Sequence, residues 1–252
     1  TKLCSGIKGT NMGKKLTIAR IFMVLAGVCI TLATLLTSID TAAMDKRFYR
    51  HQYEKLGTAE TIGVSEEALM EATTVLLDYM SGKRDDLSLV VEKDGIRTQM
   101  FTDETEVKHM VDVQALYELM LTVRNWLAFL AVGFVIAAFC LRIPPADGMK
   151  KLLIGLFLGL AVPIVCGALA AVDFNWFWTQ FHHVFFTNDL WLLNPATSVL
   201  IQMVPEEFFS AIVLKILIWF AVVLALWIGL AVLTMCICQK RKGKKDEAIV
   251  GH

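Results

Sequence analysis

The chain has 252 residues, no net charge and a hydrophobic fraction of 56%. Soluble globular domains contain about 45–50% apolar residues, so this composition indicates an integral membrane protein. The zero net charge identifies no partner, and we expect none among nucleic acids. None of the six cysteines lies in a polar loop expected outside the cell, so a disulfide framework is not expected. Cys236 and Cys238, near the end of an apolar stretch, fit either palmitoylation or small apolar packing.

Four apolar stretches are each long enough to cross a hydrocarbon core of about 30 Å at about 1.5 Å per residue. The first is interrupted only by Arg20 near its start. A cleaved signal peptide with a site at residues 41–43 is the alternative, although its apolar region would be long. Met12 is a possible native start, which would make residues 1–11 an extension. We expect transmembrane helices at 16–37, 122–141, 151–172 and 211–238, with cytoplasmic tails at 1–15 and 239–252, the first of them disordered.

Basic residues are distributed unevenly between the ends of these spans. The N-terminal tail with Arg20, the turn at 142–151 and the C-terminal tail together hold 13 Lys or Arg against 3 acids, whereas 173–210 holds no Lys or Arg. Positively charged loops stay on the cytoplasmic side of a membrane. Both termini are therefore predicted to face the cytoplasm, and both large loops, 40–121 and 173–210, are predicted to face outward.

The 40–121 loop is polar, with 17 Asp or Glu against 9 Lys or Arg, and it carries its own secondary-structure signals. Helix-stopping glycines, a serine N-cap and hairpin-turn residues predict a mixed α/β domain between the first and second spans. The expected elements are a helix at 45–56 stopped by Gly57, a helix from Ser65 to Gly82, a hairpin turning at 93–95, and an amphipathic helix after Thr102.

The 173–210 loop has too many polar groups to cross a bilayer. Nine aromatic residues nevertheless lie between Trp176 and Phe209, a composition typical of a segment at the boundary between lipid and water. We therefore expect an all-α integral membrane protein whose second, shorter outer loop is interfacial.

His109 lies three residues from both Glu106 and Asp112. On a helix surface the histidine can meet either carboxylate, and a carboxylate can orient an imidazole as a general base. A solvated helix face with a chance histidine has the same spacing, so both interpretations stay open at this point.

His182 lies among the rings of Phe181, Phe185 and Phe186. An imidazole buried between rings keeps its neutral form, which suits a base or a hydrogen-bond donor to an ester carbonyl. A histidine tolerated at a membrane interface is the alternative. His183 would point about 100° away on a helix, at 3.6 residues per turn.

Other polar residues in this loop have ordinary structural explanations as well. Glu206 follows a proline at the expected start of the fourth span, as is common at helix N-termini. Asn188 and Trp191 fit a turn with an interfacial anchor, although an asparagine amide can also hold an oxyanion.

Motifs for several enzyme classes are missing from the sequence. There is no GxSxG, Walker A, HExxH or CxxC motif. A zinc site from His109, Asp112, His182 and His183 is chemically possible, but this spacing is generic. Arg20, Arg124 and Lys215 are the ionisable residues near the spans, all toward their ends, so no proton pathway through the bilayer is predicted.

Two motifs together are similar to those of a known family. Residues 106–113 read ExxHMxDV after Phe101, and residues 181–209 read FHHVFFTNDLWLLNPATSVLIQMVPEEFF. Both resemble the bacterial lipoprotein intramolecular transacylases, integral membrane proteins with the same four-span layout, over about residues 16–238. One departure is Ser198, where the family tends to have aspartate.

The resemblance implies an acyltransferase of the bacterial cytoplasmic membrane with its active site at the outer face and no metal or cofactor. It would move the sn-2 acyl chain of a diacylglyceryl-modified lipoprotein to the amine of the lipidated N-terminal cysteine. By this resemblance His109 is the general base, and Asp112 or Glu106 orients it. The residues expected to hold the ester or other parts of the substrate are His182, Tyr79, Asn188, Trp191, Glu206 and Glu106.

This assignment carries a structural condition. His109 can reach an ester at the headgroup level only if the helix at 104–120 lies flat or folds back near the membrane. The competing functions are a non-enzymatic membrane sensor or scaffold and a zinc-dependent membrane hydrolase. A tetraspanin-like or claudin-like protein would require cysteines in the outer loops, which this chain lacks.

Overall fold

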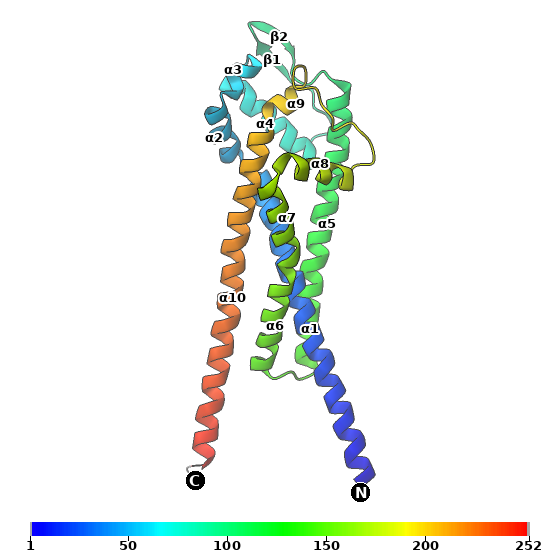
Figure 1. Cartoon of the computed structure of the whole chain (residues 1–252), viewed down its shortest axis with the longest axis vertical. Coiled ribbons are helices and arrows are strands. Elements are labelled where there is room, and N and C mark those ends of the chain that lie inside the picture. Colours follow the sequence, from blue (N-terminus) through cyan, green and yellow to red (C-terminus); the bar gives the residue numbers. More distant parts are fainter. Residues whose placement is uncertain (1, 251–252) are drawn as a thin grey trace. The chain divides into compact units, whose positions relative to one another are not determined.

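The computed structural model describes residues 2–250, which are mostly helical (Figure 1). Its helices are α1 to α10 and its strands are β1 and β2. In chain order they are α1 Lys2–Ala43, α2 Lys46–Leu56, α3 Thr58–Ile62, α4 Glu66–Met80, β1 Val90–Lys93, β2 Ile96–Gln99, α5 Glu104–Cys140, α6 Pro145–Gly159, α7 Ala161–Val172, α8 Phe174–Phe185, α9 Val199–Met203 and α10 Glu206–Val250.

Four helical stretches of the described chain are long and apolar enough to cross a membrane, which confirms the predicted multi-pass membrane protein. They are Met12–Ala43, Glu104–Cys140, Pro145–Val172 and Glu206–Gly243.

The prediction of a disordered N-terminal tail is wrong for the described part of that tail, because α1 already begins at Lys2. Once a helix has nucleated, each further residue adds one backbone hydrogen bond, so the apolar span extends into the polar tail.

The third span differs from the single helix predicted at 151–172. It begins at Pro145 and is interrupted at Leu160, between α6 and α7. Pro163 lies in the first turn of α7 and has no backbone N–H to donate to the carbonyl of Gly159. The interruption therefore follows from a proline that is tolerated at a helix start and not in a helix interior.

The chain divides into two compact units. The first contains the described residues up to Thr37, Val123–Val165 and the described residues from Ile218. The second contains Ser38–Thr122 and Cys166–Leu217. Both α5 and α10 cross a unit boundary along the chain.

Small residues set the packing of α1 against α6 in the first unit. A Cβ added at Gly155 would lie 2.0 Å from the carbonyl oxygen of Val24, and one at Gly27 would lie 2.4 Å from that of Leu152. Such backbone approach is typical of small residues at helix interfaces in membranes. The hydroxyl of Thr31, which is fully buried, lies 3.1 Å from the Gly27 carbonyl oxygen and 3.0 Å from that of Leu156.

The second unit has the local structure that its caps and turns predict. Gly57 ends α2 with a φ of 63°, and the side chain of Ser65 accepts a hydrogen bond from the Ala68 N–H at 3.1 Å. β1 and β2 pair as an antiparallel hairpin, turning through Asp94 and Gly95, which both have positive φ. Two consecutive left-handed residues are the conformation that a tight two-residue hairpin turn requires.

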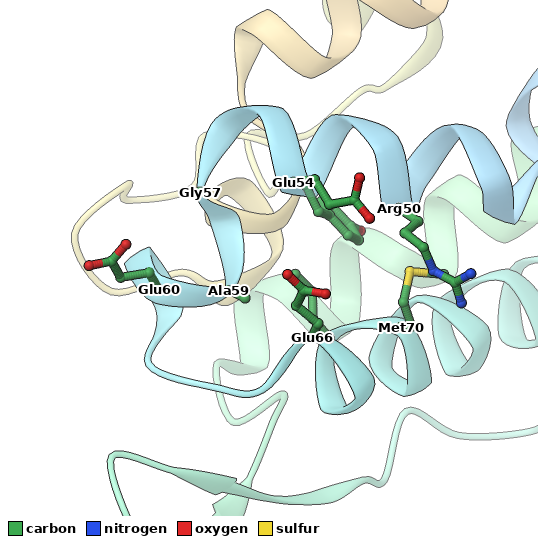
Figure 2. Close-up of a pocket in the computed structure, with 9 residues that line it drawn as sticks. Arg50, Glu54, Gly57, Ala59, Glu60, Glu66 and Met70 are labelled. Carbon is green, nitrogen blue, oxygen red and sulfur yellow. The ribbon is translucent and has the colours of Figure 1, made fainter.

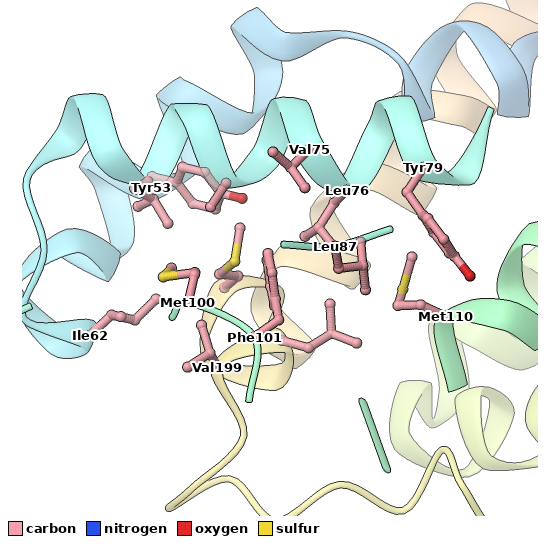
Figure 3. Close-up of a cluster of buried hydrophobic side chains, with 14 of the residues drawn as sticks. Tyr53, Ile62, Val75, Leu76, Tyr79, Leu87, Met100, Phe101, Met110 and Val199 are labelled. Atoms are coloured by element: carbon pink, nitrogen blue, oxygen red, sulfur yellow. The ribbon is translucent and has the colours of Figure 1, made fainter. Parts of the chain in front are cut away.

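A hydrophobic core holds the elements of the second unit together (Figure 3). Val75, Leu76 and Tyr79 come from α4, and they pack with side chains from the hairpin region, α5 and α9. The other labelled members of this core are Tyr53, Ile62, Leu87, Met100, Phe101, Met110 and Val199.

A pocket of about 210 Å³ lies on the same unit between α2, α3 and α4 (Figure 2). Arg50 and Glu54 from α2, Glu60 from α3 and Glu66 from α4 line it. All four of these residues are exposed, so this pocket is a surface hollow, and it contains none of the predicted site residues.

Candidate active site

Two histidines that are distant in sequence meet in the second unit. His109 lies on α5 and His182 on α8, and their ring centroids are 6.1 Å apart. Both side chains are buried, and the ring of Phe186 packs against each of them, at 5.2 Å from His109 and 5.5 Å from His182. The geometry therefore brings residues of the two sequence motifs into one site.

Helix α8 lies in the segment predicted to be an interfacial loop, and its local sequence explains why a helix forms there. The side chain of Asp173 caps it by accepting a hydrogen bond from the Trp176 N–H at 2.9 Å. Trp176 and Val184 are exposed on α8, whereas His182 is buried. Helix α8 is thus amphipathic and directs one of its two histidines inward.

The orientation of His182 is fixed by the backbone of its own helix. Its Nδ1 lies 2.8 Å from the carbonyl oxygen of Trp178. Because a carbonyl only accepts, Nδ1 carries the proton, and in the neutral ring Nε2 has a free lone pair. Burial lowers the pKa of His182 from its ordinary value, against the opposing effect of this hydrogen bond. The neutral ring is therefore the favoured form.

Two buried polar nitrogens of this site have no hydrogen-bond partner within the described chain. They are Nδ1 of His109 and Nε1 of Trp191. The Trp191 ring is stacked on His182, with a centroid distance of 4.7 Å and an interplanar angle of 29°. Buried polar groups in native proteins are nearly always paired, so two exceptions at one site indicate groups that a ligand would satisfy.

The two carboxylates predicted to orient His109 also hold another segment of the chain, and their role toward His109 stays a prediction. Asp112 accepts a hydrogen bond from Nδ2 of Asn188 at 2.9 Å. Glu106 is fully buried and accepts from the Ser198 hydroxyl and, at 2.8 Å, from the Leu200 N–H. Glu106 and Asp112 thus anchor the 188–200 segment to α5, and Ser198 donates one of these hydrogen bonds.

An apolar cavity of about 470 Å³ adjoins the histidine pair, a volume typical of small-molecule sites. His109, His182 and Trp191 line it together with Asn175, Trp178 and Thr179. Its remaining walls are almost entirely hydrophobic. They comprise Ala43, Tyr49, Leu76, Leu77, Met80, Met110, Val113, Leu192, Leu193, Leu200, Ile201, Val204, Phe208, Phe209 and Ile212.

Tyr79, Asn188 and Glu206, which were also predicted to contact the substrate, do not line this cavity. Tyr79 packs in the hydrophobic core, and its backbone carbonyl accepts a hydrogen bond from Gln114 at 2.6 Å. Glu206 lies in the first turn of α10 and accepts from Nδ2 of Asn175 at 3.0 Å, so it touches the site only through that asparagine. Asn188 and Asp112 line a neighbouring hollow of about 430 Å³.

The condition that the 104–120 helix folds back is not met, because α5 is one helix from Glu104 to Cys140. The structure instead brings α8 to His109. The N-terminal turns of α5 expose Val111 and Leu119, so apolar surface extends along this helix beyond the span predicted at 122–141.

The residues considered for a zinc site do not converge. Asp112 is bonded to Asn188, and the His183 ring packs edge-on against Trp191 at 5.2 Å. Among residues 2–250, no three His, Cys, Asp or Glu side chains are grouped so that they could hold a metal ion.

Sequence reasoning missed the carbonyl of Trp178, the amide of Asn175 and the hydrophobic wall from Phe208 and Phe209. The spacing of Trp178 and His182, four residues apart on a helix, was the available signal for the first of these. Such spacing is too common to identify a functional contact by itself.

A family model and solved structures that are similar to this chain both come from one protein family. The family model for the lipoprotein intramolecular transacylase Lit matches residues 24–209. The membrane-integral lipoprotein intramolecular transacylase from Bacillus cereus has the same fold, with a TM-score of 0.70 at 20% identity, over 92% of this chain and 99% of that chain. A variant of that protein with histidine replaced by arginine aligns with a TM-score of 0.71 at 20% identity, over 96% and 99%. The comparison with curated proteins gives no match.

The family model spans both sequence motifs and the site that they form, and it covers well over half of the chain. The chain belongs to the lipoprotein intramolecular transacylase family, a family of acyltransferases.

Proposed function

We propose that this protein moves the sn-2 acyl chain of a diacylglyceryl-cysteine lipoprotein to the amine of that cysteine, giving an N-acyl, S-monoacylglyceryl product. The observation that carries the proposal is the pair of buried histidines beside an apolar cavity. The cavity suits an acyl chain, and the imidazoles suit an amine that must lose a proton.

The reaction needs no nucleophile from the protein. Ester and amine belong to one molecule, so the substrate itself supplies their proximity. The amine nitrogen forms a bond to the ester carbonyl carbon, and the bond from that carbon to the glycerol oxygen breaks. The proton that the amine loses is the proton that the glycerol oxygen gains.

His109 is proposed as the group that carries this proton. The nitrogen with no partner, Nδ1, is buried, and burial favours the neutral imidazole that can accept a proton. An α-amine has an ordinary pKa of about 7.7–8.0, so a substantial fraction is already neutral near physiological pH.

His182 is proposed to orient the amine. The Nδ1–H is committed to the Trp178 carbonyl, which leaves Nε2 as an acceptor. A neutral primary amine has two N–H groups. If one donates to His109 and the other to His182, the lone pair of the amine is directed toward the ester. Asp112 and Asn188 contribute by fixing the segment that follows α8.

The membrane arrangement proposed here has both termini in the cytoplasm and the second unit at the outer face. The charge asymmetry supports it, since the segment 173–210 carries no Lys or Arg. Exposed Val184, Phe185 and Leu192 support contact of this unit with the headgroup layer, where the substrate's ester lies.

Tandem mass spectrometry of a synthetic diacylglyceryl-cysteine lipopeptide tests the proposal. The transfer leaves the parent mass unchanged, so only fragments can show an acyl group on the cysteine nitrogen. Wild type and His51→Ala, which changes an exposed histidine of α2, are expected to form this product, whereas His109→Ala is expected to form almost none. A free amine after incubation with wild type would refute the function and favour a sensor or scaffold. Metal analysis of the purified protein tests the hydrolase alternative.

A further inference from the structure

The proposed transfer creates a negative charge that the site must stabilise. When the amine attacks, the carbonyl oxygen becomes an oxyanion, and it returns to a carbonyl when the glycerol oxygen leaves. Preformed donors aimed at such an oxygen are among the largest contributions to acyl-transfer catalysis. The two imidazoles serve the amine, so another group of the site has to supply the donor.

Asn188 was the donor expected from sequence, but its amide is engaged elsewhere. Its Nδ2 donates to Asp112, and its Oδ1 accepts from the Leu190 N–H at 3.1 Å. It also does not line the cavity beside the histidines. Asn175 does line that cavity, but its Nδ2 donates to Glu206.

Trp191 has the properties that Asn188 lacks. Its ring lines the cavity and stacks on His182, and its Nε1 is buried with no hydrogen-bond partner within residues 2–250. An indole N–H can only donate, so it can be satisfied only by an acceptor. A buried donor left without an acceptor destabilises a fold, which argues that this one is retained for a ligand.

Two hydroxyls also line the cavity, on Tyr49 and Thr179. The Tyr49 ring packs against Tyr53 and Phe208 and makes no ring contact with a histidine in the described chain. Stacking on His182 places Trp191 directly beside the groups that hold the amine.

We propose that the indole N–H of Trp191 is the catalytic donor to the oxyanion formed at the ester carbonyl. This assignment rests on the proposed function and adds to it the group that stabilises the charge. The acyl oxygen would accept the N–H hydrogen bond most strongly in the tetrahedral intermediate. Its loss should therefore slow the chemical step and leave substrate binding nearly unchanged.

The test measures kcat and KM for wild type, Trp191→Phe and Trp176→Phe with the fragment-ion assay. Trp176 is exposed on α8 and does not line the cavity, so it is a matched control. Trp191→Phe is expected to lower kcat about 100-fold with KM within about twofold, in line with losses of single oxyanion donors. Trp176→Phe is expected to retain wild-type kcat.

Replacement of Trp191 by benzothienylalanine separates the N–H from the ring. This analogue keeps the bicyclic shape and carries sulfur in place of the N–H, so it should fold like wild type and lose kcat as Trp191→Phe does. Wild-type kcat in either variant would overturn the assignment, as would a loss seen with Tyr49→Phe and not with Trp191→Phe. An inactive wild type would instead refute the proposed function, and the oxyanion role with it.

Discussion

The two units differ in how they treat buried polar groups. In the first unit the buried hydroxyl of Thr31 has two backbone carbonyls within hydrogen-bond distance. In the second unit His109 and Trp191 each leave a buried nitrogen without a partner in the described chain. An unpaired buried polar group costs about 1–3 kcal/mol. The buried hydroxyl in the first unit thus stabilises helix packing. In the second unit, the unpaired nitrogens lower the stability of the fold at the proposed active site.

The largest expected effect on stability lies in the first unit. Gly155→Val should lower the thermal unfolding midpoint in detergent by about 10 °C or more, because its Cβ would meet backbone atoms of α1 that cannot move independently. Gly133→Ala is the control, since a Cβ there meets nothing within 4 Å. Equal melting of the two variants would contradict the close packing of α1 and α6.

Removing a buried carboxylate that accepts hydrogen bonds should also destabilise the second unit. Glu106→Ala removes the acceptor of the Ser198 hydroxyl and of the Leu200 N–H, and leaves both buried donors unsatisfied. We expect a loss of about 3 kcal/mol in unfolding free energy. Glu104→Ala, which changes a carboxylate 86% exposed on the same helix, should cost less than about 0.5 kcal/mol. The contrast is measured by thermal or denaturant unfolding.

The pH dependence of the second unit is expected to reflect its histidine pair, because both rings are buried. Burial lowers the pKa of His182, so this ring stays neutral at pH values where an ordinary histidine with a pKa of about 6.5 is protonated. The acid limb of the transacylase rate should therefore fall below pH 6.5. The unfolded chain binds the proton more readily, so stability is lost as pH decreases below about 6.5. An acid limb above pH 6.5 would contradict a buried neutral ring.

A smaller effect is expected at the ion pair of Lys215 and Asp45. Their charged atoms are 2.5 Å apart, and the ammonium also lies 4.5 Å from the centre of the Phe48 ring. The hydrogen bond from Lys215 lowers the pKa of Asp45, so the stabilisation by this pair is lost as pH falls through the acid range. Lys215→Met keeps the apolar stem and should cost about 1 kcal/mol at neutral pH and less at pH 3. The same cost at both pH values would exclude the ion pair as its source.

Local features of the fold could be predicted from sequence because short-range physics determines them. The glycine that ends α2, the serine that caps α4 and the turn of the hairpin each act within a few residues. The four spans follow from length and hydropathy in the same way. The interruption at Leu160 depends on a single proline. The uninterrupted apolar sequence around this proline gave no sign of a helix break.

The site was only partly predictable, because its contacts join residues far apart in the chain. Asn188 and Asp112 are 76 positions apart, and Ser198 and Glu106 are 92 apart. Spacing along one helix suggested that Glu106 and Asp112 serve His109, whereas the tertiary structure uses them to hold the second loop. The meeting of His109 with His182 needed the fold of both loops.

Two adjacent histidines allow the most direct test of the proposed active site. His182 is buried against His109, whereas His183 contacts the edge of Trp191 and does not line the cavity. His182→Phe and His183→Phe both keep a ring at their position, and the rate of acyl transfer to the cysteine amine is measured for each. A loss of about 100-fold or more is expected for His182→Phe, and a loss of at most about threefold for His183→Phe. Equal rates for the two variants would contradict an active site built on the pair of His109 and His182.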